Sequence, residues 1–138
     1  MRDYLTVTYI VTGAYIASAL GGWDTGLQTL FVFMAIDYIS GLSLAGIFKK
    51  SKKSDTGALS SKCSWQGLAK KGMQLLIVMI AYRLDIMLGI NFVRTAVIIA
   101  FISNELISIT ENAGLMGIPI PDAVSKAIDI LNREEKTK

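Results

Sequence analysis

The feature that most constrains this chain is an uncharged stretch near its N-terminus, residues 4–23, which holds twenty residues without a charged side chain. A helix of that length rises about 30 Å, which is the thickness of the hydrocarbon core of a bilayer. The stretch is longer than the apolar region of a secretory signal, which spans about 7–15 residues. It therefore predicts a helix that crosses a membrane.

The composition of the whole chain points the same way. Of its 138 residues, 52% are hydrophobic and 18% are charged, and the mean hydropathy is +0.49. Soluble domains carry roughly 25% charged residues, and a chain this small needs a polar coat to stay in water. The length suits one domain, so we expect a single all-α integral membrane domain over residues 1–138.

Three further apolar segments are long enough to span, although each contains at least one charge. A turn at Gly89-Ile90-Asn91 separates the last two. The sequence predicts about four transmembrane helices, while three spans with the first segment lying in the interface is an alternative topology. The expected segments are residues 4–23, 25–48, 72–92 and 93–110.

A basic loop, residues 49–71, separates the second and third segments and holds seven of the fourteen Lys and Arg residues. By the positive-inside rule this loop is cytoplasmic, and four spans would place both termini there too. Its lysines should be attracted to the anionic lipid bilayer, whereas nucleic acid is not expected because no set of aromatic stacking residues accompanies them. The loop lysines are Lys49, Lys50, Lys52, Lys53, Lys62, Lys70 and Lys71.

The chain after residue 110 predicts one more element. Pro121 suits the first turn of a helix, and apolar residues then recur at helical spacing over residues 121–132. This short C-terminal amphipathic helix would either lie on the membrane or pack against a partner.

Charged residues inside the apolar segments are the most informative positions, because each costs roughly 2.5–3.5 kcal/mol at the centre of a span unless it finds a partner or water. From the helix rise, Asp37 and Arg83 lie at the same depth, about 16 Å from the cytoplasmic end, and are expected to pair. Asp85 and Arg94 flank the outer turn and could form a second pair. Glu105 would pair with a loop lysine, stay hydrated or be protonated. These charges either hold a four-helix bundle together or line a water-filled space that forms when subunits assemble.

Small residues recur at every fourth position in and after the first segment, namely Ala14, Ser18, Gly22 and Gly26. Such a row lets helix backbones approach closely in lipid. We expect it to mediate helix association, either within one subunit or between subunits.

Several chemistries are not expected. The chain has no histidine and a single cysteine, Cys63, so it lacks the residues of a His-based or Cys-cluster metal site and of an intramolecular disulfide. It also lacks the glycine-rich motifs of nucleotide sites. We expect no enzyme activity, cofactor or metal.

Several short runs together resemble a known family. Residues 37–41 read Asp-Tyr-Ile-Ser-Gly, residues 104–112 read Asn-Glu-Leu-Ile-Ser-Ile-Thr-Glu-Asn, and residues 117–121 read Gly-Ile-Pro-Ile-Pro. Their order and spacing are similar to those of the toxin-secretion and phage-lysis holins, the family that includes the clostridial toxin-release holins. The positions that carry the resemblance are Asp37, Tyr38, Gly41, Asn104, Glu105, Ser108, Glu111, Asn112, Pro119 and Pro121.

The resemblance implies a non-enzymatic, multi-pass protein of the bacterial cytoplasmic membrane. Such a protein would form homo-oligomeric lesions that release a cell-wall hydrolase (endolysin) or a protein toxin from the cytoplasm. Two other classes stay open: a small four-helix transporter or exporter, and a membrane scaffold without pore activity. Small exporters place an essential Glu in their first span, whereas residues 4–23 contain no acid.

Overall fold

The helices of the chain follow its apolar segments. The computed structural model describes residues 1–137, and Lys138, the last residue of the expected domain, lies outside the described residues. Within that range the regular structure is helical throughout, which confirms the all-α class. The elements are α1 (Arg2–Ala19), α2 (Thr25–Ser43), the π-helical turn η1 (Leu44–Phe48), α3 (Ser61–Leu88), α4 (Val93–Leu115) and α5 (Asp122–Thr137).

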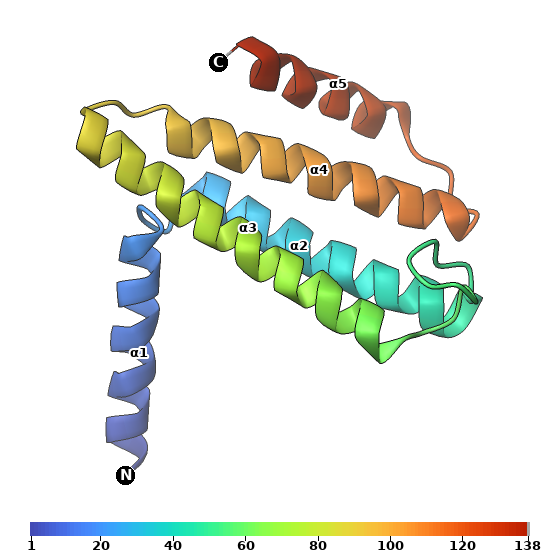
Figure 1. Cartoon of the computed structure of the whole chain (residues 1–138), viewed down its shortest axis with the longest axis horizontal. Helices are drawn as coiled ribbons and strands as arrows, with labels where there is room; N and C mark the ends of the chain where they lie inside the picture. The colour runs from blue at the N-terminus through green and yellow to red at the C-terminus, as the bar shows by residue number, and fades with distance from the viewer. Residues whose placement is uncertain (138) are drawn as a thin grey trace.

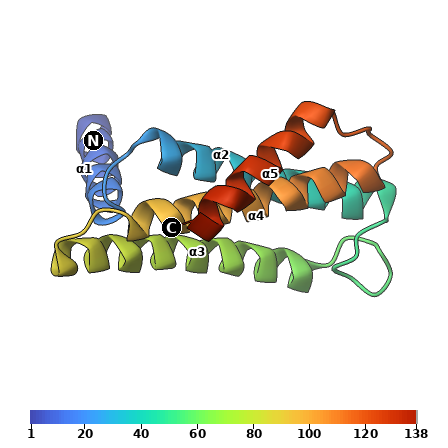
Figure 2. The same ribbon diagram turned by 90° about the horizontal axis from the view of Figure 1, so that it is seen from above.

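Helix α4 is the centre of the arrangement, because it packs against α2, α3 and α5 (Figure 1). Figure 2 shows α5 crossing α4 obliquely, while α2, α3 and α4 run side by side. The buried apolar core joins the loop after α1 to α2, α3 and α4. It consists of Leu20, Leu27, Leu30, Met34, Val78, Ile98 and Ile102.

Among the described residues, two helical segments are long and apolar enough to cross a membrane, Thr25–Phe48 with a mean hydropathy of 1.8 and Val93–Leu115 with 1.5. These match the second and fourth expected segments. Spanning by the first and third segments stays a prediction, and with it the total of four.

Helix α3 begins at Ser61 rather than at residue 72, so the basic loop is shorter than expected and covers residues 49–60. Residues 61–71 lack proline and include Leu, Ala, Lys and Gln, which favour helix. As a result, Lys62, Lys70 and Lys71 lie on α3 and not in the loop.

The expected row of small residues does not run along one helix. Helix α1 ends at Ala19 because Gly21 and Gly22 adopt left-handed backbone angles, with φ of +91° and +106°. Ala14 and Ser18 therefore lie on α1, Gly22 lies in the turn, and Gly26 lies on α2 beside Ile98. No residue of α1 is buried, and the helix projects away from the bundle (Figure 1).

The C-terminal helix packs on its own chain. The Ser103 hydroxyl of α4 donates a hydrogen bond to Asn132 Oδ1 of α5 at 2.6 Å, and Leu131 packs against the core. Helix α5 begins at Asp122, close to the expected start, and continues to Thr137 rather than ending at residue 132.

The turn after α1 generates a stability prediction. A Cβ atom on Gly21 would lie 2.5 Å from Arg94 Nε, whereas a Cβ on Gly22 would meet nothing within 4 Å. Gly22→Ala therefore carries only the strain of a left-handed angle, about 1–3 kcal/mol. Gly21→Ala adds overpacking against Arg94, about 1–3 kcal/mol more. In thermal unfolding in detergent, the midpoint temperature of Gly21→Ala should be clearly lower than that of Gly22→Ala. Equal midpoints would contradict the close approach of Arg94 to Gly21.

Candidate functional site

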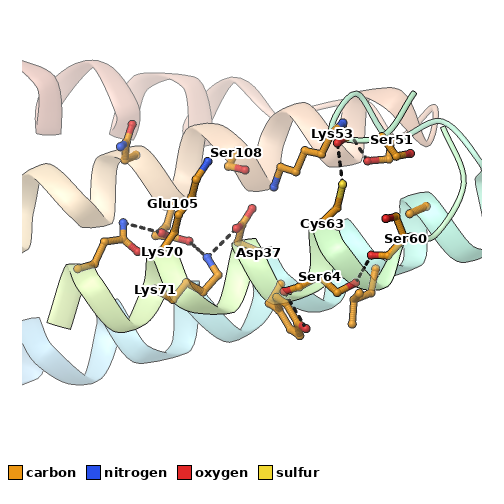
Figure 3. Close-up of a pocket in the computed structure, with 18 of the residues that line it drawn as sticks. Asp37, Ser51, Lys53, Ser60, Cys63, Ser64, Lys70, Lys71, Glu105 and Ser108 are labelled. Atoms are coloured by element: carbon orange, nitrogen blue, oxygen red, sulfur yellow. Dashed lines mark hydrogen bonds and ion pairs between the residues drawn. The ribbon is translucent and has the colours of Figure 1, made fainter. Parts of the chain in front are cut away.

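One ammonium group joins three helices inside the bundle. Lys71 Nζ of α3 donates to Asp37 Oδ2 of α2 at 2.7 Å and to Glu105 Oε2 of α4 at 2.6 Å (Figure 3). The three side chains are 13%, 8% and 6% exposed, respectively. Because these ion pairs are largely withdrawn from solvent, they are screened far less than surface pairs.

Amide and hydroxyl groups complete this arrangement. Gln74 Nε2 donates to Glu105 Oε1 at 3.0 Å, and Asn112 Nδ2 donates to Ser40 Oγ at 2.9 Å and, more weakly, to Asp37 Oδ1 at 3.4 Å. Among the described side chains, no buried nitrogen or oxygen lacks a hydrogen-bond partner. We call Asp37, Lys71, Gln74, Glu105 and Asn112 the Lys71 cluster.

A second polar group lies at the opposite end of the bundle, around Arg94. Its guanidinium donates from Nε to the Leu20 carbonyl at 2.6 Å, from Nη2 to the Gly22 carbonyl at 3.0 Å, and from Nη1 to Asp24 Oδ2 at 2.5 Å. Arg94 thus ties the turn after α1, and the start of α2, to the first turn of α4.

Asp85 and Asp24 cap helix N-termini in this second group. The Asp85 carboxylate accepts hydrogen bonds from the Val93 and Arg94 backbone N–H groups, each at 2.9 Å. Asp24 caps α2 by accepting from the Leu27 N–H at 2.9 Å. The Arg94 guanidinium beside it is the main reason that the pKa of Asp24 lies below its ordinary value.

The predicted pair between Asp37 and Arg83 is wrong. Asp37 is bound by Lys71, and Arg83 is exposed. Depth alone does not fix a contact, because rotation around the helix axis decides which face a residue occupies. The inward face of α3 follows Lys71, Gln74, Val78, Ala81 and Asp85, and Arg83 falls off that face.

The other two predictions on the intramembrane charges fare differently. The structure places Asp85 and Arg94 together, but Asp85 binds the Arg94 backbone while the guanidinium binds Asp24. Of the three states left open for Glu105, pairing with a basic residue of 49–71 is the one that is found, and the partner is Lys71.

Sequence reasoning missed the roles of Lys71, Gln74 and Asp24. The run of charged and polar residues that ends at Lys71 predicts a loop position for this lysine. The available signal was the 3-4-3-4 spacing from Lys71 to Asp85, which is the repeat of a helix face packed in a bundle. For Asp24, the signal was an Asp directly before an apolar helical segment.

A cavity of about 490 Å³ adjoins the Lys71 cluster, bounded by α2, α3, α4 and the loop 49–60. Most residues that carried the family resemblance gather here, whereas Glu111, Pro119 and Pro121 are exposed elsewhere. Those that line the cavity or belong to the cluster are Asp37, Tyr38, Gly41, Asn104, Glu105, Ser108 and Asn112.

Known proteins resemble this chain over most of its length. The model of the bacteriophage holin family matches residues 14–133. An uncharacterized protein of Listeria innocua is 37% identical over 133 residues, covering 96% of this chain and 89% of the relative. A probable holin of Bacillus phage phi105 is 30% identical over 113 residues, covering 81% of this chain and 78% of the relative. No solved structure matches the chain.

The Lys71 cluster predicts strong coupling between its members. Lys71→Met leaves two buried carboxylates without their cation, which should destabilise the protein by about 3–5 kcal/mol. In a double-mutant cycle measured by unfolding in detergent, Asp37→Asn and Lys71→Met should couple by about 0.5–3 kcal/mol. Asp37→Asn and Arg83→Gln should be additive. Coupling to Arg83 instead of Lys71 would show that the ion pair is wrongly assigned.

The Asp24–Arg94 ion pair predicts a loss of stability in acid. Because the pKa of Asp24 is lower in the folded protein than its ordinary value of 3.8, its contribution is present above pH 3.8 and is lost as the pH falls through the lower folded value. Asp24→Asn should flatten this part of the curve of unfolding midpoint against pH. Asp55→Asn, which removes an exposed loop charge, should leave it unchanged, and equal effects of the two variants would argue against the pair.

Proposed function

Because the chain belongs to the bacteriophage holin family, we propose that it oligomerises in the bacterial cytoplasmic membrane and forms lesions there. Through these lesions a cell-wall hydrolase, or a protein toxin, would leave the cytoplasm. Holins permeabilise membranes rather than catalyse reactions, so the side chains described above act through charge and packing. Residues 49–60, with their four lysines, would face the cytoplasm.

The observation that carries the proposal is that the bundle buries a network of paired charges beside its apolar core, while large apolar side chains cover much of its outside. The Lys71 cluster is buried between α2, α3 and α4, while large apolar side chains such as Val32, Ile39 and Ile80 are exposed. In a bilayer those outer faces would meet lipid, and buried charges would hold their partners because hydrocarbon offers none.

This arrangement suits a protein that is inert alone and opens in an assembly. Each of α2, α3 and α4 contributes one charged group to the cluster, so separating α3 from the other two would expose an acid or a base on every helix. In lipid that separation is opposed by the lost ion pairs. Around a space shared by several subunits, water would replace those partners, and the same charged faces would line the lesion.

Helix α1 supplies a surface through which subunits would meet. It has no buried residue, and its exposed side chains include Tyr4, Tyr9 and Tyr15. Ala14 and Ser18 give it a smooth patch one turn long, where another helix backbone can approach.

Regulated expression in a bacterium whose membrane potential is monitored tests the proposal. The potential should stay intact while the protein accumulates and then collapse abruptly, and co-expressed hydrolase should lyse the cells at that moment. Lys71→Met should collapse the potential earlier at equal membrane level, because the buried network no longer opposes separation of the helices. Lys62→Met, an exposed change on the same helix, should keep the original timing. A slow decline in potential, or none, would contradict a holin.

A further inference from the structure

The cavity beside the Lys71 cluster has the properties of a ligand site. Its volume of about 490 Å³ falls within the range of about 300–1,000 Å³ that is typical of small-molecule pockets. One part of its wall is apolar, formed by Leu42 of α2, Ala45 of η1, Met73 and Ile77 of α3, and Phe101 of α4. The other part is polar and is formed by the loop 49–60, by α3 and by polar side chains of α2 and α4, among them Asp37, Glu105 and Ser108 (Figure 3).

The polar part carries an excess of positive charge. Three lysines line the cavity, Lys53, Lys70 and Lys71, against two acids, Asp37 and Glu105. Lys71 forms ion pairs with both acids, whereas neither Lys53 nor Lys70 forms an ion pair with any described side chain. Figure 3 shows both of these side chains extending into the cavity, toward the side where Ser108 lies. Two ammonium groups without a counter-ion favour an anion and disfavour a metal cation.

We propose that this cavity binds one anionic phospholipid, with its phosphate between Lys53 and Lys70 and part of an acyl chain against the apolar wall. The inference rests on the proposed membrane location. The end of the cavity at the loop 49–60 lies where the apolar span formed by α2 and η1 ends at Phe48, and before the uncharged part of α3 that follows Lys71. That level corresponds to lipid headgroups, where basic pockets between transmembrane helices bind anionic lipids.

A lipid in this position would link the loop 49–60 to the helices around the cavity. The cavity is walled by the loop and by all three helices that meet at Lys71, so one bound phosphate would hold Lys53 of the loop and Lys70 of α3 together. Lys70 directly precedes Lys71. The occupied site would thereby stabilise the helix arrangement on which the Lys71 cluster depends.

Native mass spectrometry of the full chain in a neutral detergent tests the site, with phosphatidylglycerol and phosphatidylcholine of identical acyl chains as probes. Phosphatidylglycerol should bind the more tightly, and K53Q/K70Q should weaken its binding about tenfold or more. K52Q/K62Q is the matched control, because it also removes one loop lysine and one α3 lysine, both outside the cavity wall. If both double variants lost affinity for phosphatidylglycerol equally, the proposed site would be overturned, because the lipid would then be attracted to the basic segment as a whole.

A second variant tests the apolar wall without changing any charge. Gly67 lines the cavity on α3, and a Cβ there would make only ordinary contact with the Tyr38 ring, at 3.8 Å. Gly67→Leu should therefore fold, occupy the cavity and abolish the preference for phosphatidylglycerol. If inorganic phosphate is the ligand instead, it would displace the lipid from the unmodified protein and would bind normally to Gly67→Leu. That result would show that the site holds a free anion, and it would overturn the lipid assignment.

The two proposals fail separately. Lipid binding is measured without lysis, so selective binding by a protein that does not collapse the membrane potential would overturn the holin proposal alone. An abrupt collapse by a protein without preference for phosphatidylglycerol would overturn the lipid site alone.

Discussion

The sharing of one lysine between two acids determines how the helices of this chain are placed. Lys71 is the single cation in contact with both Asp37 and Glu105 among the described residues, and these three side chains come from three different helices. Helices α2 and α3 make much less contact with each other than either makes with α4. The ion pair between Lys71 and Asp37 is therefore the main polar link between them. Replacing such a group by an apolar one would cost more here than at the surface, since the two acids would be left buried together.

This dependence explains why a bundle with an apolar exterior contains so much charge. Hydrophobic packing between helices gives little preference for one arrangement when the surroundings are as apolar as the interfaces. Ion pairs and amide hydrogen bonds at fixed positions do give a preference, because each misplacement leaves a polar group without a partner. In the proposed assembly, water would satisfy the same groups, so one network would govern both the stability of the single subunit and the opening of the lesion.

Much of the fold could be predicted from the sequence. The uncharged and weakly charged segments located α2 and the start of α4 correctly, and Gly89 marked the turn between α3 and α4, where its φ is +65°. The paired prolines located the start of α5. The end of α1 was misplaced because Gly21 and Gly22 are apolar by composition yet break the helix by their backbone angles.

The candidate site was only half predictable. Asp37, Glu105 and Arg94 stood out because a charge in an apolar segment needs a partner, but the partners were not identified, apart from a loop lysine for Glu105. Charge depth is a one-dimensional quantity, whereas pairing also depends on the rotation of each helix. Lys71 and Asp24 lay at the ends of segments, where a charge is ordinary and draws no attention, and only the packed structure reveals what they bind.

The attachment of α1 has a mechanical consequence. The helix is joined to the bundle at a pair of glycines. Arg94 holds this turn by donating hydrogen bonds to the Leu20 and Gly22 carbonyls, whereas no side chain of α1 is buried along its length. With 18 residues it is a rod about 27 Å long. Because of that length, even a small rotation at Gly21 and Gly22 would displace the far end of α1 by several ångströms. In the proposed membrane assembly, each subunit would thus reach beyond its own bundle, and neighbouring subunits would touch through α1 before their bundles meet.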